Sequence, residues 1–329
     1  MDLAVEKCEI HELPSARGCT YVVPASDFAL ALRAGGGFSS DQEMNVARKL
    51  GVTDAEVDKL CDAILKALAG RALDPDTLRK AIGNASRSLG EGGKKKGITT
   101  TLPLGLSRLQ MMGEIRRIPM NGRLDQQRYK YTPWRPNPLA KFKLQQDEVN
   151  VELAKRYFRW IGPATSAEFQ WFSGFGVTAA KDAMAVLGLV RFEEDRWMFA
   201  EDLDSLRSHK IPPAANYKLT SSLDAMTLLR RDHKMLLEGP SFKKLGSFGD
   251  PPHHLIFDRG RIVGVWEFDT DSNSIVWHSF EKADWRLEEA VTDAQHFIRN
   301  ELGDVRSFSL DSPKSRVPKI EAIRKMSGK

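Results

Sequence analysis

The stretch DEVNVELAKRYFRWIGPATSAEFQWFSGFGVTAAKDAMAVLGLVRFEEDRWMFAEDL, residues 147–203, decides the expected fold. Its first third carries apolar residues at spacings of three and four, which predicts a helix from about residue 149 to 161 with one buried face. Gly162-Pro163 ends this helix, because proline cannot fit inside a helical turn. The residues expected on the buried face are Val149, Leu153, Tyr157, Trp160 and Ile161.

Two further helices and a hairpin follow in the same stretch. Thr165 or Ser166 is a suitable N-cap for a short second helix, and Thr178 for a third. Two short apolar runs, 189–192 and 197–199, are separated by a charged turn and predict a β-hairpin. Three helices and a hairpin describe a winged helix-turn-helix. The alternative is a small helical domain followed by an unrelated hairpin.

The segment KRYFRWIGPATSAEFQWFSGFGVTAAKDAMAVL, residues 155–187, resembles the third winged helix of the AlkZ/YcaQ family of DNA glycosylases. The Gly-Pro-Ala-Thr turn, the Phe-x-Trp-Phe-Ser-Gly run and the alanine-rich helix after them carry the resemblance. It implies tandem winged helices followed by a smaller β-rich domain, curved around a concave DNA-binding face. It also implies removal of alkylated or crosslinked bases, as in interstrand-crosslink repair.

Composition excludes several classes of protein. The chain of 329 residues is long enough for two or three cores, and 41% hydrophobic with 28% charged residues is typical of a globular protein. No apolar run approaches the roughly 20 residues of a membrane helix, and the N-terminus does not read as a signal peptide. Three cysteines without metal-ligand spacing indicate a reducing cytoplasm. We expect a cytoplasmic monomer with no metal, no cofactor and no membrane contact.

Positive charge is concentrated in the middle of the chain. The formal net charge is +5, whereas residues 87–143 alone hold 13 Lys/Arg against 3 Asp/Glu. A basic block in an otherwise slightly acidic chain is the pattern of a nucleic-acid-binding protein. The alternative is that part of this charge only solvates a loop. We expect double-stranded DNA to be the partner, and the resemblance implies that this DNA is damaged.

The N-terminal segment contains one clear strand, Cys19–Val23, before Pro24 and a helix capped by Ser26 or Asp27. A lone strand needs a partner, so this one should be the last strand of a wing. Residues 17–24 resemble the family's Arg-Gly-Thr-x-His-x-Val-Pro segment, with Cys19 in place of threonine and Tyr21 in place of histidine. In the family this segment closes the first winged helix, so residues 1–45 are expected to be a remnant of it.

A second winged helix is expected over residues 46–135. Its third helix runs from about Pro103 to Met112, and its hairpin consists of residues 114–120 and 128–132 around Asn121-Gly122, a strong turn signal. Residues 84–100, rich in Gly, Ser and Lys, are expected to be a mobile loop. This copy should bind most of the phosphates, whereas the third is expected to be a packing scaffold or a backbone contact. The residues expected to contact DNA are Arg17, Lys94, Lys95, Lys96, Arg108, Arg116, Arg117, Arg123, Arg128, Lys130, Thr165 and Lys181.

The remaining boundaries follow from changes in pattern. A linker at 133–146 leads into the third winged helix, 136–211, and β-runs at 253–269 and 274–280 predict a β-rich C-terminal domain over 212–310. An amphipathic helix from Trp285 to Leu302 belongs to that domain. Residues 311–329 are expected to be a flexible tail. The fold class is therefore α+β, with tandem winged helix-turn-helix domains followed by a small β-rich domain.

Catalytic residues are not identified by the sequence. The family's Gln-x-Gln or Gln-x-Asp motif lies upstream of the segment matched at 17–24, and the chain offers only Gln145-Gln146-Asp147, in the linker, where helix capping explains Asp147. Asp224 and Asp232, which correspond to family aspartates, are weak candidates, since capping or salt bridging explains them equally well. His253-His254 and His278 lack partners at metal spacing. Enzymatic activity is therefore uncertain, and the alternative function is that of a non-enzymatic DNA-binding regulator or adaptor.

Overall fold

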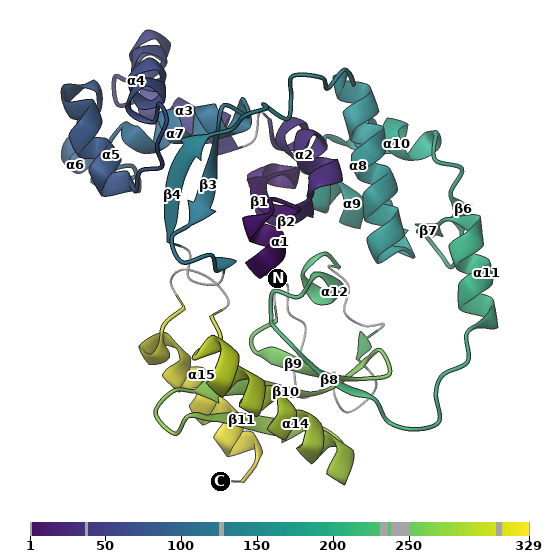
Figure 1. The fold of residues 1–329 in the computed structure, drawn as a ribbon. Helices are drawn as coiled ribbons and strands as arrows, with labels where there is room; N and C mark the ends of the chain where they lie inside the picture. The colour runs from purple at the N-terminus through teal and green to yellow at the C-terminus, as the bar shows by residue number, and fades with distance from the viewer. Residues whose placement is uncertain are drawn as a thin grey trace. The chain divides into compact units, whose positions relative to one another are not determined.

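The computed structural model describes residues 2–36, 39–124, 128–230, 236–237, 251–306 and 311–328. They form two compact units: unit 1 comprises residues 1–160 and 169–189, and unit 2 comprises 161–168 and 190–329. Helices and small antiparallel sheets alternate along the chain (Figure 1), which confirms the mixed α and β class. Within the described ranges, no helix has the length and apolar character that crossing a bilayer requires.

Unit 1 is mostly helical and contains two hairpins. Its first elements are α1 (Asp2–Glu6), β1 (Ile10–Pro14), β2 (Thr20–Pro24), α2 (Phe28–Gly35), α3 (Ser39–Arg48), α4 (Asp54–Ala67) and α5 (Pro75–Ile82). They are followed by α6 (Gly90–Lys94), α7 (Leu102–Met111), β3 (Ile115–Pro119), β4 (Tyr129–Pro133), α8 (Gln146–Ile161), α9 (Ser166–Ser173) and α10 (Val177–Ala185), of which α8 and α9 cross the boundary with unit 2.

The N-terminal hairpin supplies the partner that the predicted strand needs. The strand expected at Cys19–Val23 is β2, and it pairs antiparallel with β1, whose residues 10–14 carry no strong strand pattern. One face of the hairpin packs on α2 and on Trp134, and the buried residues of this core are Leu13, Val23, Phe28, Ala31, Leu32 and Trp134. His11 lies among the same aromatic rings, edge-on to Phe28 and Trp134.

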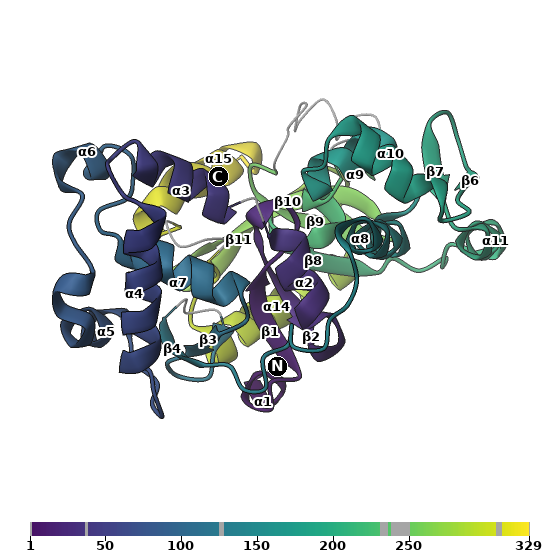
Figure 2. The same ribbon diagram turned by 90° about the horizontal axis from the view of Figure 1, so that it is seen from above.

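Helices α4, α5 and α7 form the main core of unit 1. Thr53 caps α4 by accepting the Glu56 N–H, and Asp74 caps α5 ahead of Pro75. Figure 2 shows α4 between α5 and α7. Gly105 allows α7 to approach α4 closely, because a Cβ at this position would lie 2.8 Å from Ile64 Cδ1.

The segment 84–100 is not the mobile loop that its composition predicts. Residues 90–94 form helix α6, and Ser88 and Thr100 form an isolated β-bridge at the base of the segment. Gly93 is buried so tightly that a Cβ there would lie 2.3 Å from Ile98 O. Backbone hydrogen bonds therefore order a segment that has few apolar side chains to bury.

Helix α8 is the helix expected from residue 149, with one error in its buried face. Val149, Leu153, Tyr157 and Ile161 are buried as predicted, but the Trp160 side chain is 54% exposed and Phe158 is buried instead. Phe158 lies four residues after the buried Ala154 and three before Ile161, so the buried face extends toward these residues, whereas Trp160, three residues after Tyr157, lies at its other edge. The Tyr157 ring stacks on Phe172 of α9 with centroids 4.8 Å apart.

Unit 2 contains a three-stranded and a four-stranded antiparallel sheet. The smaller sheet has the order β5-β7-β6, from β5 (Ala164–Thr165), β6 (Val190–Arg191) and β7 (Arg196–Met198). The larger has the order β11-β10-β9-β8. Its strands are β8 (Tyr217–Thr220), β9 (His254–Asp258), β10 (Arg261–Asp269) and β11 (Ser274–Ser279), and the helices of unit 2 are α11 (Ala200–Ser208), α12 (Ala225–Leu228), α14 (Trp285–Phe297) and α15 (Pro313–Met326).

The four-stranded sheet is covered on both faces by helices. Leu287 and Val291 of α14 pack with Ile256 and Trp266 on one face. On the other face, Ile323 of α15 packs with a different set of apolar residues, among them Leu255, Phe257, Ile262 and Val265. A bulge between Ile262 and Gly264 shifts the alternation of β10 by one residue. Burial on both faces explains why every residue of β9 is inaccessible to solvent.

Within the segment 311–329, which was expected to be a flexible tail, residues 313–326 form helix α15. Ser312 and Ser315 form a capping box that starts α15, and the helix buries its own residues Ile320 and Ile323. The Arg316 side chain is 1% exposed, and its guanidinium donates to both carboxylate oxygens of Asp304 at 2.8 Å. The apolar face of the sheet explains the order, because Leu255, Phe257 and Val265 need a cover.

Candidate nucleic-acid interface

The basic hairpin of unit 1 has two chemically different faces. Strands β3 and β4 pair in register, with Arg116 opposite Thr132, Arg117 opposite Tyr131 and Ile118 opposite Lys130. The Met120 N–H donates to Arg128 O at 2.8 Å and extends this register by one pair. Successive side chains of a strand point to opposite faces. Even-numbered residues therefore share one face and odd-numbered residues the other.

The even-numbered face, named here the cationic face, carries three basic side chains. Arg116 and Lys130 are partly exposed, and Arg128 and Met120 at the distal end are exposed. Figure 1 shows the hairpin extending away from α4, α5 and α7. This places positive charge where a phosphate backbone can reach it. The residues of the cationic face are Arg116, Ile118, Met120, Arg128, Lys130 and Thr132.

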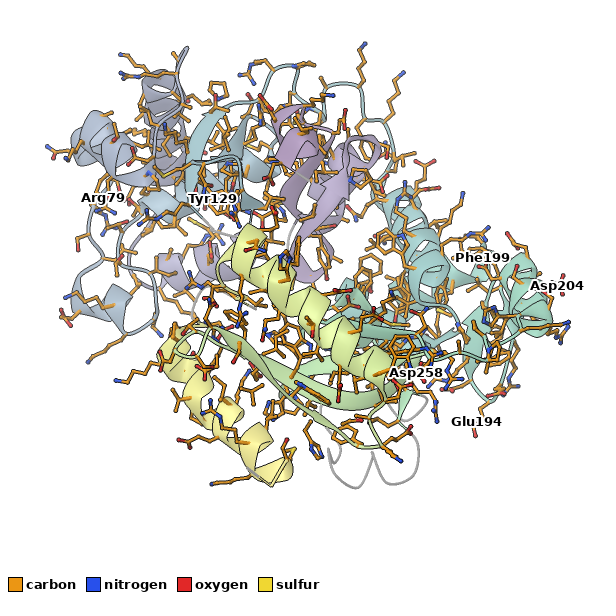
Figure 3. All side chains as sticks on the ribbon, turned by 60° about the horizontal axis from the view of Figure 1, so that its bottom comes forward. Arg79, Tyr129, Glu194, Phe199, Asp204 and Asp258 are labelled. Carbon is orange, nitrogen blue, oxygen red and sulfur yellow. The ribbon has the colours of Figure 1, made fainter. Side chains whose placement is uncertain are left out.

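Arg117 lies on the opposite face and has different partners. Its guanidinium carbon lies 4.7 Å from the centroid of the Tyr129 ring, and its Nη2 lies 4.0 Å from Glu12 Oε2. The Tyr129 hydroxyl, labelled in Figure 3, donates to the same Glu12 carboxylate at 2.6 Å. Arg117 therefore joins the hairpin to β1 and lies on the other face from Arg116, although both were expected to contact DNA.

Burial governs the ionisation of the groups around this junction. It raises the pKa of Tyr129, with the hydrogen bond to Glu12 acting in the same direction, so the phenol keeps its proton. It also lowers the pKa of His11 to about 4, helped by the charges of Arg116 and Arg117. In the described part of the chain, His11 Nε2 has no hydrogen-bond partner. The junction thus combines a neutral imidazole, a neutral phenol and the Glu12–Arg117 pair.

The connection between β3 and β4 begins with the predicted Asn-Gly turn. Gly122 adopts φ +76°, its N–H donates to Pro119 O, and the Arg123 N–H donates to Asn121 Oδ1 at 3.2 Å. This turn does not close the hairpin, because β4 begins only at Tyr129. Arg123 therefore lies in the connection and not on either strand face, and residues 125–127 lie outside the described part.

The other basic residues predicted in unit 1 lie on separate elements. Lys94 of α6 forms an ion pair with Glu91 at 2.7 Å, and Lys95 and Lys96 are exposed just after that helix. Arg108 of α7, the third helix expected in the second winged helix, pairs with Asp58 of α4 at 2.9 Å.

Arg17, Thr165 and Lys181 belong to three different environments. Arg17 adopts φ +57°, and its guanidinium carbon lies 3.9 Å from the centroid of the Trp171 ring. Lys181 is exposed on α10. In unit 2, Thr165 and Glu168 form a capping box, in which the Glu168 N–H donates to Thr165 Oγ1 at 3.0 Å and the Thr165 N–H donates to Glu168 Oε2 at 2.9 Å. The predicted capping role of Thr165 is confirmed.

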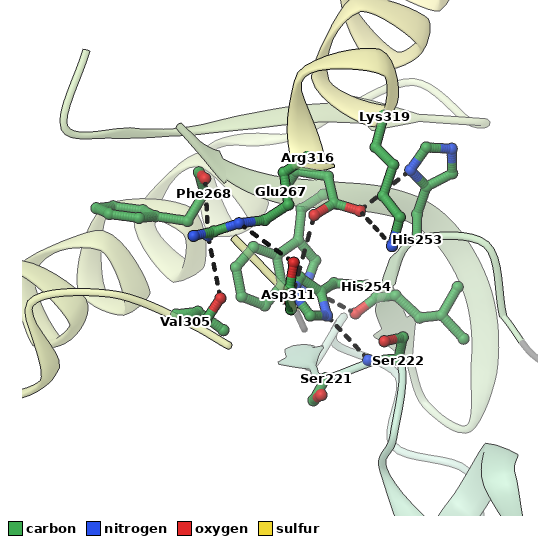
Figure 4. A network of polar contacts seen from close by, with 12 residues as sticks. Ser221, Ser222, His253, His254, Glu267, Phe268, Val305, Asp311, Arg316 and Lys319 are labelled. Carbon is green, nitrogen blue, oxygen red and sulfur yellow. Dashed lines mark hydrogen bonds and ion pairs between the residues drawn. The ribbon is translucent and has the colours of Figure 1, made fainter. Parts of the chain in front are cut away.

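A buried polar network occupies the centre of unit 2 (Figure 4). Glu267 Oε1 lies 3.3 Å from His253 Nδ1 and 3.9 Å from Lys319 Nζ, and Glu267 Oε2 lies 3.9 Å from His254 Nε2. The Ser222 N–H donates to His254 Nδ1 at 2.9 Å, and burial lowers the pKa of His254. These groups satisfy one another, so the network fastens α15 and the segment before α12 to the sheet.

The predicted catalytic candidates are not brought together in the described residues. Asp224 is the N-cap of α12 and accepts the Met226 N–H at 2.9 Å, whereas Asp232 lies outside the described residues. Asp147 is exposed in the first turn of α8. Across the described ranges, no group of three His, Cys, Asp or Glu residues is arranged to hold a metal ion.

Comparison with known proteins identifies the fold and then the family. The chain is similar to the solved structure of the Streptomyces sahachiroi DNA glycosylase AlkZ, with a TM-score of 0.60 and 18% sequence identity over 91% of this chain and 81% of that one. No curated protein matches the sequence. Residues 1–297 match the model of the family described as DNA glycosylase AlkZ-like. The chain belongs to this family, which confirms the resemblance first seen at residues 155–187.

Sequence reasoning located the basic hairpin and missed the junction behind it. Glu12 is 105 residues from Arg117, and nothing in residues 9–14 reads as a strand without the structure. The two faces of the hairpin, in contrast, could have been predicted from the period of two alone. The basic residues 116, 128 and 130 are even-numbered, whereas Arg117, Tyr129 and Tyr131 are odd-numbered. This alternation was the available signal.

Proposed function

We propose that this chain binds double-stranded DNA through the cationic face of the β3–β4 hairpin. The observation that carries this proposal is the placement of Arg116, Arg128 and Lys130 on one face of a hairpin whose other face is packed. Membership of a DNA glycosylase family supports it. Arg and Lys side chains on one face neutralise phosphates and release counterions, which gives tight but salt-sensitive binding.

The proposal includes a tandem winged-helix organisation. Residues 46–135 provide α4, α5, α7 and the β3–β4 hairpin in the order that a winged helix requires. Residues 136–211 provide α8, α9 and α10, followed by β6 and β7. Residues 1–45 would then be the last part of a first copy, and 212–310 the β-rich domain, to which α15 adds a helix. A cytoplasmic, monomeric protein fits the three free cysteines.

For activity, we propose excision of alkylated or crosslinked bases from damaged duplex DNA. Such a reaction breaks the bond between C1′ and the base nitrogen while water adds to C1′, and it needs an oxygen that stabilises the cationic sugar. The use of Asp224 as a helix cap favours a second candidate, a non-enzymatic adaptor on the same scaffold. In that case the chain recognises damaged DNA without cutting it.

A charge-reversal experiment tests DNA binding. The variant with Arg116, Arg128 and Lys130 all replaced by Glu should bind a 20-base-pair duplex at least tenfold more weakly than the natural chain, as measured by fluorescence anisotropy at low salt. The control replaces Lys66, Arg79 and Lys80 by Glu, which changes the net charge equally on the exposed surface of α4 and α5. Equal losses of affinity in both variants would contradict the proposed role of the cationic face.

An excision assay separates the two activities. Duplexes carrying N7-alkylguanine or an interstrand crosslink are incubated with the protein, and abasic sites are detected by strand cleavage in alkali. Abasic product that disappears in the charge-reversal variant supports the glycosylase. Binding without any abasic product supports the adaptor, and absence of binding contradicts both.

A further inference from the structure

Met120 occupies an unusual position at the distal end of the cationic face. Its side chain is 50% exposed, although Pro119 before it is buried. Single exposed apolar residues are common on protein surfaces and by themselves need no explanation. Met120 differs from them because its neighbours on this face are basic: Arg128 lies directly opposite, and Lys130 and Arg116 follow on the same face.

The backbone around Met120 is held in place by hydrogen bonds, while its side chain is half-exposed. The Met120 N–H donates to Arg128 O at 2.8 Å, and the Gly122 N–H donates to Pro119 O at 3.3 Å. Gly122 supplies the positive φ that turns the chain sharply after Asn121. The apolar side chain therefore projects from a fixed corner of the hairpin, one pair beyond the last strand residues, Pro119 and Tyr129.

We propose that Met120 is a wedge that inserts between adjacent base pairs of duplex DNA while the cationic face holds the flanking phosphates. Proteins that distort duplexes place apolar side chains, methionine among them, between base steps in this way. A flexible, unbranched thioether suits an opening of irregular shape. The inference rests on the proposed DNA binding and adds the local unstacking of bases, which any enzyme that reaches a base in a duplex requires.

The energetics make the proposal distinct from a simple contact. Inserting the wedge costs the stacking free energy of one base step. The burial of one Met side chain contributes a favourable free energy of comparable size, so the two nearly cancel. Loss of Met120 should therefore change the distortion of the DNA strongly and its affinity only slightly. Loss of Arg116 or Lys130 should instead lower the affinity strongly and change the distortion of the DNA only slightly.

Fluorescence of 2-aminopurine measures the unstacking directly. A set of 12-base-pair duplexes carries the probe at successive positions, and saturating protein should raise the fluorescence at least twofold in one or more of them. Met120→Ala should abolish this rise and keep the dissociation constant within threefold, while Met120→Leu retains the rise. Met112→Ala is the matched control, because Met112 is 52% exposed at the end of α7, outside the hairpin.

The possible outcomes separate this inference from the proposed function. Duplex binding without any rise in the natural chain, or a rise that survives in Met120→Ala, overturns the wedge and leaves DNA binding intact. A rise that Met112→Ala also removes overturns it too. Absence of duplex binding by the natural chain overturns the proposed function and the wedge together.

Discussion

Arg116 and Arg117 are neighbours in the sequence and have different partners in the fold. The pleat of β3 turns Arg116 toward the cationic face and Arg117 toward Tyr129 and Glu12. Behind this junction lies His11, which is 3% exposed and held between the edges of Phe28 and Trp134. Its imidazole is neutral in the folded protein because burial opposes its charged form.

Stability should therefore fall in acid through His11. Its pKa is about 4 in the folded protein and ordinarily 6.5, so the unfolded chain binds more protons between these values. The contribution is complete above pH 6.5 and is lost progressively as the pH falls toward 4, by about 3 kcal/mol in all. The free energy of unfolding of His11→Phe should lack this part of the pH dependence. Urea unfolding at pH 7.5, 6 and 5 measures it.

An exposed histidine provides the control for this experiment. His209→Asn, at the end of α11, should leave the profile of the natural chain unchanged. A His11→Phe profile that runs parallel to that of the natural chain from pH 7.5 to 5 would show that His11 does not govern the acid response.

At the scale of elements, α15 shows how a charged residue can be part of a core. Arg316 is enclosed by Asp304, Asp311 and the carbonyl oxygens of Phe268 and Val305, which accept its donors at 2.8 to 3.5 Å. Guanidinium carries five N–H donors in a fixed plane, so several acceptors can satisfy it without water. The helix is thus attached to the sheet by polar and apolar contacts together.

Removal of this guanidinium should destabilise the protein strongly. Arg316→Ala leaves buried acceptors and carboxylates without their partner, at a cost of about 3–5 kcal/mol. Arg324→Ala on the same helix removes an ion pair to Asp269 whose arginine is 45% exposed, so the loss should be smaller, about 1 kcal/mol. Urea unfolding followed by tryptophan fluorescence measures both, and equal losses would contradict this account.

The sequence predicted most elements of this fold and failed where order depends on contacts outside the element itself. Helices such as α4 and α5 carry their caps and apolar stripes within their own residues, so local pattern is sufficient. Residues 90–94 and α15 carry little hydrophobic signal; the spacing of Val317, Ile320 and Ile323 was the available hint of a helix. The order of residues 90–94 comes from a β-bridge between Ser88 and Thr100 at the ends of the same segment, and that of α15 comes from a sheet face far away in the sequence.

At the scale of the molecule, the net charge of +5 conceals a basic block whose members are used differently. Lys94, Arg108 and Arg117 have acidic neighbours within 4.0 Å, whereas Arg116, Arg128 and Lys130 line one face. The sequence predicted the location of positive charge. It could not show which cations are already engaged, because Asp58 and Glu12 approach only through tertiary packing.

Salt dependence should reveal this division of the charge. Each phosphate contact contributes about 0.9 to the slope of log K against log salt concentration, so Lys130→Gln should reduce the slope by about that amount. Arg117→Gln, which removes the same charge from the packed face, should leave the slope unchanged. The slopes come from anisotropy titrations between 50 and 200 mM salt, and a similar change in both variants would contradict the assignment of faces.

The bulge in β10 restricts the evolution of the C-terminal half in a specific way. Because of it, Val265 joins the layer beneath α15, and Glu267 and Asp269 meet Lys319 and Arg324 of that helix. Deleting a single residue there would rotate Trp266 and Phe268 toward α15 and send both carboxylates into the layer lined by Leu287. Substitutions in β10 can accumulate one at a time, but a change in its length would invert the whole strand, and relatives should preserve the spacing between Ile262 and Asp269 even where the residues differ.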